Sequence, residues 1–238
     1  MANFKTRILQ GSSQPYPASD INIVIDVIRA FTVSHIAFLR GVREVLLVNT
    51  VEEALVLRAN NPAYLLAGEI GGLPIEHFDL DNSPLTFSLA DIEHKTLVQK
   101  TSNGVKATLL ALNAETILVT GLSNARNTAN YAQKIAAGKE HCIINIIASH
   151  AGDDDDLACA GYIQDILLGL NKIKIEDIQS RIKNSRPAQK FFDPAQIKFD
   201  SRDMDFCTRE IQCDFVMEVD KSAPTPRLIK KQLTCLAT

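Results

Sequence analysis

The stretch "NIVIDVIRAFT", residues 22–32, decides the fold prediction. It opens with an apolar run over residues 22–25, and that length and β-branched content are typical of a strand buried on both faces. A helical pattern follows over residues 32–40, so the stretch reads as a strand leading directly into a helix. Asp26 and Arg29 stand in the connection between them.

The same alternation continues along the chain. Further apolar runs lie at 45–48, 64–67, 96–99, 116–119 and 142–147, and helical patterns lie at 51–60, 105–112, 124–137 and 157–170. Thr50 precedes Val51-Glu52-Glu53, as expected of a helix N-cap with acids in the first turn. Strand and helix in turn predict an α/β fold, three-layered α/β/α, with a largely parallel or mixed sheet.

The pattern changes after about residue 172. Residues 171–184 are charged and helical, residues 191–194 (Phe-Phe-Asp-Pro) mark a break, and short elements are expected near 205–207 and 215–219. We predict a single domain over residues 1–238, with 172–238 as a C-terminal extension packed on it.

Composition excludes several classes of protein. The chain has 238 residues, of which 46% are hydrophobic, so it can bury a substantial core. A net charge of −3 without a basic stripe argues against nucleic acid as a partner. No apolar stretch has membrane-spanning length, the N-terminus lacks a signal-peptide core, and five cysteines without paired spacing fit reduced thiols. We therefore expect a cytoplasmic protein that does not bind membranes; its oligomeric state stays open, a homo-oligomer included.

Polar residues follow the predicted strands where each one ends. Asp26 and Arg29 follow the first run, Glu69 follows the run at 64–67, and "KTSNG" (100–104), "TGLSN" (120–124) and "SHAGDDDD" (149–156) follow the later ones. In open α/β sheets, ligands bind at the carboxyl edge. Three strands delivering acids there, and two delivering hydroxyl and amide groups, are the pattern expected of a divalent cation beside an oxyanion.

Each of these residues also has a structural explanation. An Asp at a strand end often caps a turn, and the run Asp153–Asp156 precedes a helix whose dipole its acids complement. We expect at least two of those four acids to be solvated. The sequence contains no phosphate-binding loop of the Gly-x-x-x-x-Gly-Lys-Ser/Thr type, no Gly-x-Gly-x-x-Gly turn, no Asp-x-Asp phosphatase motif and no Gly-x-Ser-x-Gly elbow. Metal-assisted attack by water, or a binding site without chemistry, remains.

Four segments carry a family resemblance. They are "VIDVIRAFT" (24–32), "GEIGGLPIEHFDLDNSP" (68–84), "KTSNGVKA" (100–107) and "DDDDLACAGYI" (153–163), with a weaker echo in "DMDFC" (203–207). In these segments, and in their order, the chain resembles the 2-phosphosulfolactate phosphatase (ComB) family. The resemblance implies Mg2+-dependent hydrolysis of 2-phospho-3-sulfolactate to sulfolactate and phosphate, a step towards coenzyme M.

On this basis we hypothesise roles for individual residues. Asp26, Glu69 and Asp156 would hold Mg2+, directly or through waters, and Arg29 would bind the phosphate through two of its N–H groups. The backbone amides of Ser102, Asn103 and Gly104 would bind phosphate or sulfonate, and Lys106 would add a second positive charge. Asp79 would act as acid or base, or serve as a metal ligand, and Asn82 and Ser83 would position Asp79 or the substrate.

Two other functions stay open. Phe31 and Val105 replace hydroxyl residues of the family pattern, which favours a non-catalytic binding module for a small anionic metabolite. A dinucleotide-binding oxidoreductase is disfavoured, because the glycine turn that such enzymes use is missing.

Overall fold

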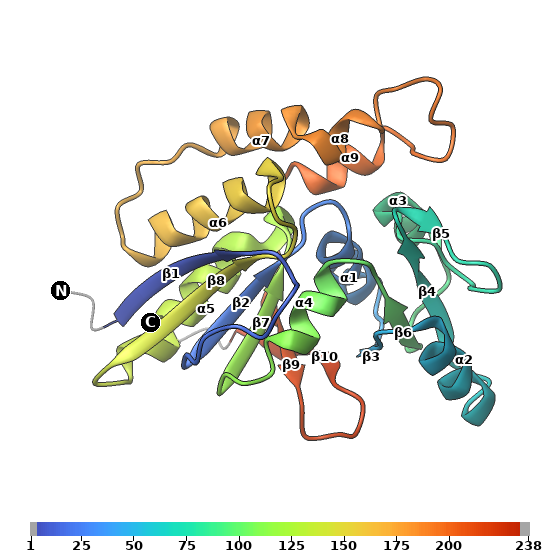
Figure 1. Ribbon diagram of the computed structural model, residues 1–238, viewed down its shortest axis with the longest axis horizontal. Coiled ribbons are helices and arrows are strands. Elements are labelled where there is room, and N and C mark those ends of the chain that lie inside the picture. Colours follow the sequence, from blue (N-terminus) through green and yellow to red (C-terminus); the bar gives the residue numbers. More distant parts are fainter. Residues whose placement is uncertain (1–3, 234–238) are drawn as a thin grey trace.

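The computed structural model describes residues 4–233 and confirms the three-layer α/β/α fold (Figure 1). Its mixed sheet has the strand order β1-β8-β2-β7-β9-β10-β3-β6-β4-β5. The strands are β1 (Phe4–Gln10), β2 (Ile21–Ile25), β3 (Glu44–Leu47), β4 (Leu65–Ile70), β5 (Leu73–Pro74), β6 (Thr96–Lys100), β7 (Thr116–Thr120), β8 (Cys142–Ala148), β9 (Phe215–Asp220) and β10 (Arg227–Gln232).

Helices cover both faces of this sheet. They are α1 (Ala30–Leu39), α2 (Val51–Asn60), α3 (Pro84–Leu89), α4 (Gly104–Leu110), α5 (Ala125–Ala137), α6 (Asp154–Leu167), α7 (Ile175–Asn184), α8 (Arg186–Gln189) and α9 (Asp203–Cys207), with a 3-10 turn at Leu122–Asn124. As predicted, Thr50 caps α2: its side chain accepts a hydrogen bond from the amide of Glu53, whose carboxylate accepts one in return. Between residues 4 and 233, no helix combines the length and apolar character needed to cross a membrane.

Side chains of β2 alternate between two hydrophobic cores. Ile21, Ile23 and Ile25 pack with residues of α5 and α6, whereas Val24 packs with residues of α1 and α4. Successive strand residues point to opposite faces, so both faces of a strand with helices on both sides are buried. This explains why every residue of β2 is buried, including Asn22.

The sheet consists of two parallel groups joined by an antiparallel hairpin. Strands β1, β8, β2 and β7 form one group, β3, β6 and β4 form the other, and β9–β10 lies between them. The hairpin is antiparallel to β7 on one side and to β3 on the other, over two residue pairs at each contact. The strands of one group therefore point in the opposite direction to the strands of the other.

Twist nevertheless brings the carboxyl ends of both groups together. Neighbouring strands rotate by roughly 20–25°, which accumulates to about 100–125° over the five steps from β2 to β6. Opposed strands rotated this far converge at their carboxyl ends. The amide of Gly104, which follows β6, accordingly donates a 2.8 Å hydrogen bond to the Asp26 carboxylate, which follows β2.

The region after residue 172 contributes to more than one layer. Helices α7, α8 and α9 lie along the top of Figure 1, where α7 packs on the outer side of α6, whereas β9 and β10 lie inside the sheet. The expected element at 215–219 is thus a strand at the junction of the two groups. That position was not predictable, because sequence patterns indicate a strand without indicating its neighbours.

Candidate active site

A cavity of about 340 Å³ lies where the two groups converge. Its lining includes Asp26, Arg29, Glu69, Asn82, Ser102, Asn103, Ser149, His150, Asp155, Asp156, Arg186 and Lys190. Both parallel groups and the region after residue 172 contribute to it. Of the residues predicted from sequence, the structure brings Asp26, Arg29, Glu69, Asn82, Ser102, Asn103 and Asp156 to this one cavity.

Three buried carboxylates, Asp26, Asp155 and Asp156, form what we call the acid cluster. The Asp26 carboxylate accepts hydrogen bonds from the amides of Ala30 (2.9 Å) and Gly104 (2.8 Å). A Cβ at position 104 would lie 2.7 Å from the Asp26 carboxylate, so only glycine lets α4 begin this close to β2.

The other two members of the acid cluster come from the first turn of α6. Asp156 accepts from the amide of Val27 and the hydroxyl of Ser149, each at 2.8 Å. The Oδ1 atom of Asp155 is buried and has no hydrogen-bond partner among residues 4–233. The acid cluster is therefore held by N–H and O–H groups, with one carboxylate oxygen left unsatisfied.

Burial makes ionisation of the acid cluster unfavourable. Desolvation, with the nearby charge of Glu69, raises the pKa of Asp26 to about 6. Desolvation and Asp26 raise the pKa of Asp155 to about 7, and desolvation with both neighbouring acids raises the pKa of Asp156 well above its usual value. A bound cation would relieve these carboxylates, because an opposite charge nearby favours the ionised form.

The expectation that at least two of Asp153–Asp156 are solvated is wrong. Only Asp154 is partly exposed, where it pairs with Arg181; the other three are buried. Asp153 lies beside His150 (2.9 Å) and Arg186 (3.1 Å). The first turn of α6 faces the cavity rather than solvent, which is why Asp155, not singled out from the sequence, belongs to the site.

Glu69 joins two loops of the second group. One carboxylate oxygen accepts from the amide of Ser102 (2.5 Å), and the other accepts from the amide of Gly72 (2.5 Å) and the hydroxyl of Ser102 (3.1 Å). The predicted amide cradle for phosphate is therefore not seen at Ser102 and Gly104, because Glu69 and Asp26 accept hydrogen bonds from those two amides.

Arg29 lines the same cavity in a fixed position. Its guanidinium donates to Asp203 (2.8 Å) and to the carbonyl of Gly72 (2.9 Å), and it lies over the rings of Phe191 (5.1 Å) and Phe199 (5.6 Å). A guanidinium has five N–H donors, so further donors remain for a ligand.

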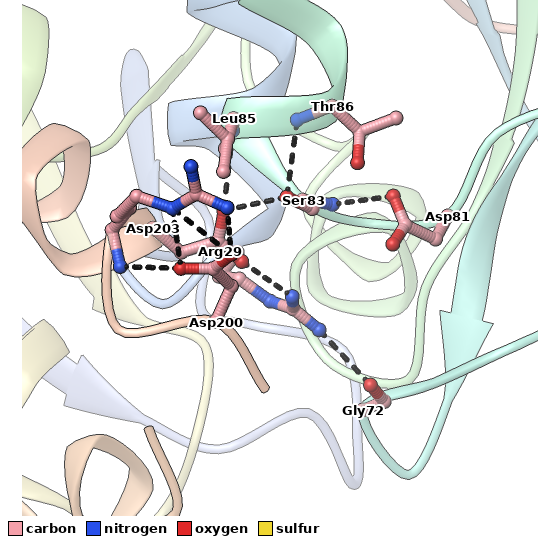
Figure 2. Close-up of polar contacts among 9 residues, drawn as sticks. Arg29, Gly72, Asp81, Ser83, Leu85, Thr86, Asp200 and Asp203 are labelled. Atoms are coloured by element: carbon pink, nitrogen blue, oxygen red, sulfur yellow. Dashed lines mark hydrogen bonds and ion pairs between the residues drawn. The ribbon is translucent and has the colours of Figure 1, made fainter. Parts of the chain in front are cut away.

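Asp203 is the residue that holds Arg29. Figure 2 shows its carboxylate between Arg29, the hydroxyl of Ser83 (2.5 Å) and the amide of Leu85 (3.1 Å). It is fully buried, and the only signal for it in the sequence is the weak "DMDFC" echo. Ser83 contacts Asp203 and is not part of the cavity lining, so it acts behind Arg29.

Besides Ser83 and Gly104, two more of the predicted residues lie outside the cavity lining. Asp79 accepts a hydrogen bond from the amide of Leu66 (2.7 Å) and pairs with Arg58 of α2, outside the lining. Lys106 is exposed on the surface of α4. Both were suggested because they lie within the 68–84 and 100–107 motifs, but the local backbone directs their side chains away from the cavity.

The two departures from the family pattern lie in the core. Phe31 and Val105 are fully buried in the hydrophobic cluster that packs against Val24. They leave the cavity lining unchanged, so they do not favour the binding-module alternative.

Comparison with known proteins identifies the family. The family model described as 2-phosphosulpholactate phosphatase matches residues 9–222. The chain belongs to this family. A probable 2-phosphosulfolactate phosphatase of Bacillus subtilis (strain 168) is 49% identical over 221 residues, which cover 93% of this chain and 96% of the relative.

More distant relatives carry the same name. Probable 2-phosphosulfolactate phosphatases of Clostridium novyi (strain NT) and Deinococcus radiodurans are each 38% identical, covering 66% and 68% of this chain and 66% and 67% of their own lengths. The resemblance inferred from the motifs is confirmed, and by family the chain is a phosphoric monoester hydrolase.

Proposed function

We propose that the chain is a Mg2+-dependent phosphatase for a small 2-phospho-hydroxy acid, 2-phospho-3-sulfolactate in the first instance, acting in the cytoplasm. The observation that carries the proposal is that the acid cluster and the fixed Arg29 line one cavity of about 340 Å³. This volume is large enough for a small phosphorylated acid of this kind. Within residues 4–233 the cysteines Cys142, Cys159, Cys207 and Cys213 are free thiols, which agrees with a reducing compartment.

The residues present fit magnesium. In residues 4–233 no three His, Cys, Asp or Glu side chains form a ready-made metal site. Magnesium does not require one, since it keeps several waters and binds through one or two carboxylates and substrate phosphate. The unsatisfied oxygen of Asp155, beside Asp26 and Asp156, supplies hard oxygen donors of this kind. Glu69, which the sequence also suggested as a ligand, has both oxygens hydrogen-bonded and stays a prediction.

The chain's own residues would bind and orient the substrate. Arg29, held by Asp203, presents its remaining donors to the phosphate oxygens, where a planar guanidinium binds in pairs. Asn82 has a buried side-chain oxygen without a partner among the described residues, so it can accept a hydrogen bond from water or substrate. When bound at the acid cluster, magnesium would supply Lewis-acid polarisation of the phosphoryl group.

Phosphate release tests the proposal. The purified chain is assayed with 2-phospho-3-sulfolactate, 2-phospholactate, phosphoenolpyruvate and 3-phosphoglycerate, each with Mg2+ or with EDTA. We expect release from the first substrate with Mg2+ and its loss in EDTA. Release that is independent of metal would refute the role of the acid cluster, and ligand binding without release would favour the binding module.

A further inference from the structure

Two cations of the region after residue 172 line the cavity, and neither was singled out from the sequence. Arg186 begins α8 and forms an ion pair with Asp153 at 3.1 Å, so its charge is already matched. Lys190 directly follows α8, four residues further on. The structure shows no hydrogen-bond acceptor and no ion-pair partner for the Lys190 ammonium within residues 4–233.

Aromatic rings hold this ammonium in place. Its Nζ lies 4.5 Å from the ring centroid of Phe199 and 5.7 Å from that of Phe191, the same two rings that flank Arg29. The position that a Cβ on Gly72 would take lies 2.7 Å from Nζ, so the lysine head rests against the β4–β5 turn. Cation–π contacts fix a cation without neutralising it.

The charges of Lys190 and Arg29 are therefore not equivalent. Arg29 is paired with Asp203, whereas the Lys190 ammonium lines the cavity without an ion-pair partner among residues 4–233. Burial, the largest cause, and the neighbouring Arg29 lower the pKa of Lys190, whereas the carboxylates of Glu69, Asp155 and Asp26 act to raise it. An anion bound in the cavity would favour the charged ammonium in the same way as these carboxylates. A half-buried ammonium kept without an acceptor is thus positioned for an anionic ligand.

We propose that Lys190 binds the second acidic group of the substrate, a sulfonate or carboxylate, while Arg29 and the acid cluster engage the phosphate. The inference rests on the proposed function and makes Lys190 a specificity-determining residue. An ammonium with three donors suits a sulfonate or carboxylate as a point charge. The substrate class is then a phosphate ester that carries a further anion, rather than a simple alkyl phosphate.

Matched substrates separate the two anions. Wild type, Lys190→Gln and Lys190→Arg are compared on 2-phospho-3-sulfolactate, on 2-phospholactate (no sulfonate) and on the phosphate ester of isethionate (no carboxylate). For Lys190→Gln we expect KM to rise about tenfold or more, with kcat nearly unchanged, on every substrate that carries the contacted group. On the substrate without that group KM should not change, and Lys190→Arg should restore most of the binding. Lys198→Gln, in the exposed segment nearby, is the control.

Two results would overturn the proposal. One is an equal change for Lys190→Gln on all three substrates, and the other is no change on any of them. Sulfolactate binding by calorimetry separates this proposal from the proposed function. If the wild type releases no phosphate but binds sulfolactate, and only Lys190→Gln loses that binding, the lysine site stands and the phosphatase proposal falls. Binding that Lys190→Gln leaves intact would refute the lysine site whatever the activity.

Discussion

The two walls of the cavity both bury charge, but they balance it differently. On one wall, Arg29 and Asp203 form an ion pair at 2.8 Å, with side chains that are 5% and 1% exposed, and Asp203 accepts further hydrogen bonds from Ser83 and Leu85. On the other wall, the acid cluster is bonded only to N–H and O–H groups.

The two parts of the lining therefore have different roles: Asp203 holds Arg29 in position, whereas the acid cluster is arranged to bind a cation. Arg29 is paired with Asp203 and also donates to the carbonyl of Gly72, so it keeps its position without a ligand and its remaining donors are ready before substrate arrives. Buried carboxylates without a cation have raised pKa values and store unfavourable electrostatic energy, which a cation releases on binding.

The largest effect should come from a substitution that breaks the Arg29–Asp203 ion pair. Asp203→Ala leaves Arg29 buried without its partner, so we expect the free energy of unfolding in urea to fall by about 3–5 kcal/mol. Phosphatase activity should fall by about 100-fold or more, because Arg29 loses its position. In the double variant Arg29→Met/Asp203→Leu, most of the stability should return while activity stays lost. Retained activity in Asp203→Ala would remove Arg29 from the site.

A smaller effect should come from the acid cluster, as a pH dependence of the protein's stability. The pKa values of Asp26 and Asp155 in the folded protein are raised to about 6 and about 7, so between about pH 4 and 7 the folded state binds more protons than the unfolded state. In EDTA, stability should therefore fall as pH rises through this window, and the melting temperature should drop by several degrees from pH 5 to pH 8.

The variant Asp155→Asn tests the source of this slope. Its side chain cannot ionise, so the melting temperature at pH 8 in EDTA should rise, the pH slope should flatten, and stabilisation by Mg2+ should weaken. Thermal unfolding with and without Mg2+ measures all three. An unchanged slope would show that the acid cluster is already ionised without strain.

The smallest effect should come from Asp79, which lies on neither wall. Asp79→Asn keeps an acceptor for the amide of Leu66 and weakens a partly exposed ion pair with Arg58, so we expect a stability loss of about 1 kcal/mol or less. Phosphatase kcat should change by less than about twofold, since a catalytic acid or base contributes far more. A large loss of kcat would restore Asp79 as acid or base and would require the Gly68–Pro84 loop to move.

Local sequence pattern predicted the elements well but their neighbours poorly. The alternation of apolar runs and helical patterns located β2, β3, β4, β6, β7 and β8 and most of the helices within a few residues. Strand β1 was missed: its side chains alternate between partly buried and exposed, so it lacks the apolar run of a central strand.

The same distinction holds for the site residues: those placed by local sequence pattern were predictable, and those placed by tertiary packing were not. Asp26, Glu69 and Asp156 were predictable because they end strands or begin a helix that leaves the sheet edge, and the structure brings them to one cavity. Asp203 and Lys190 were not predictable, because only tertiary packing of the region after residue 172 carries them there. Asp79 was misplaced, since a motif fixes sequence distance and not the direction of a side chain.

The β9–β10 hairpin has a consequence for biosynthesis. It is the hydrogen-bonded link between the two parallel groups in residues 4–233, and it follows the strands of both groups in the sequence. A nascent chain can pair β2 with β7 and β3 with β6 early, but the sheet becomes continuous only after Arg227 and Leu228 of β10, which pair with β3, have been synthesised. Joining the groups then depends on contacts of long sequence separation, which form slowly. Until that moment the ribosome carries two half-sheets with open edges, and such edges are where a chaperone would bind.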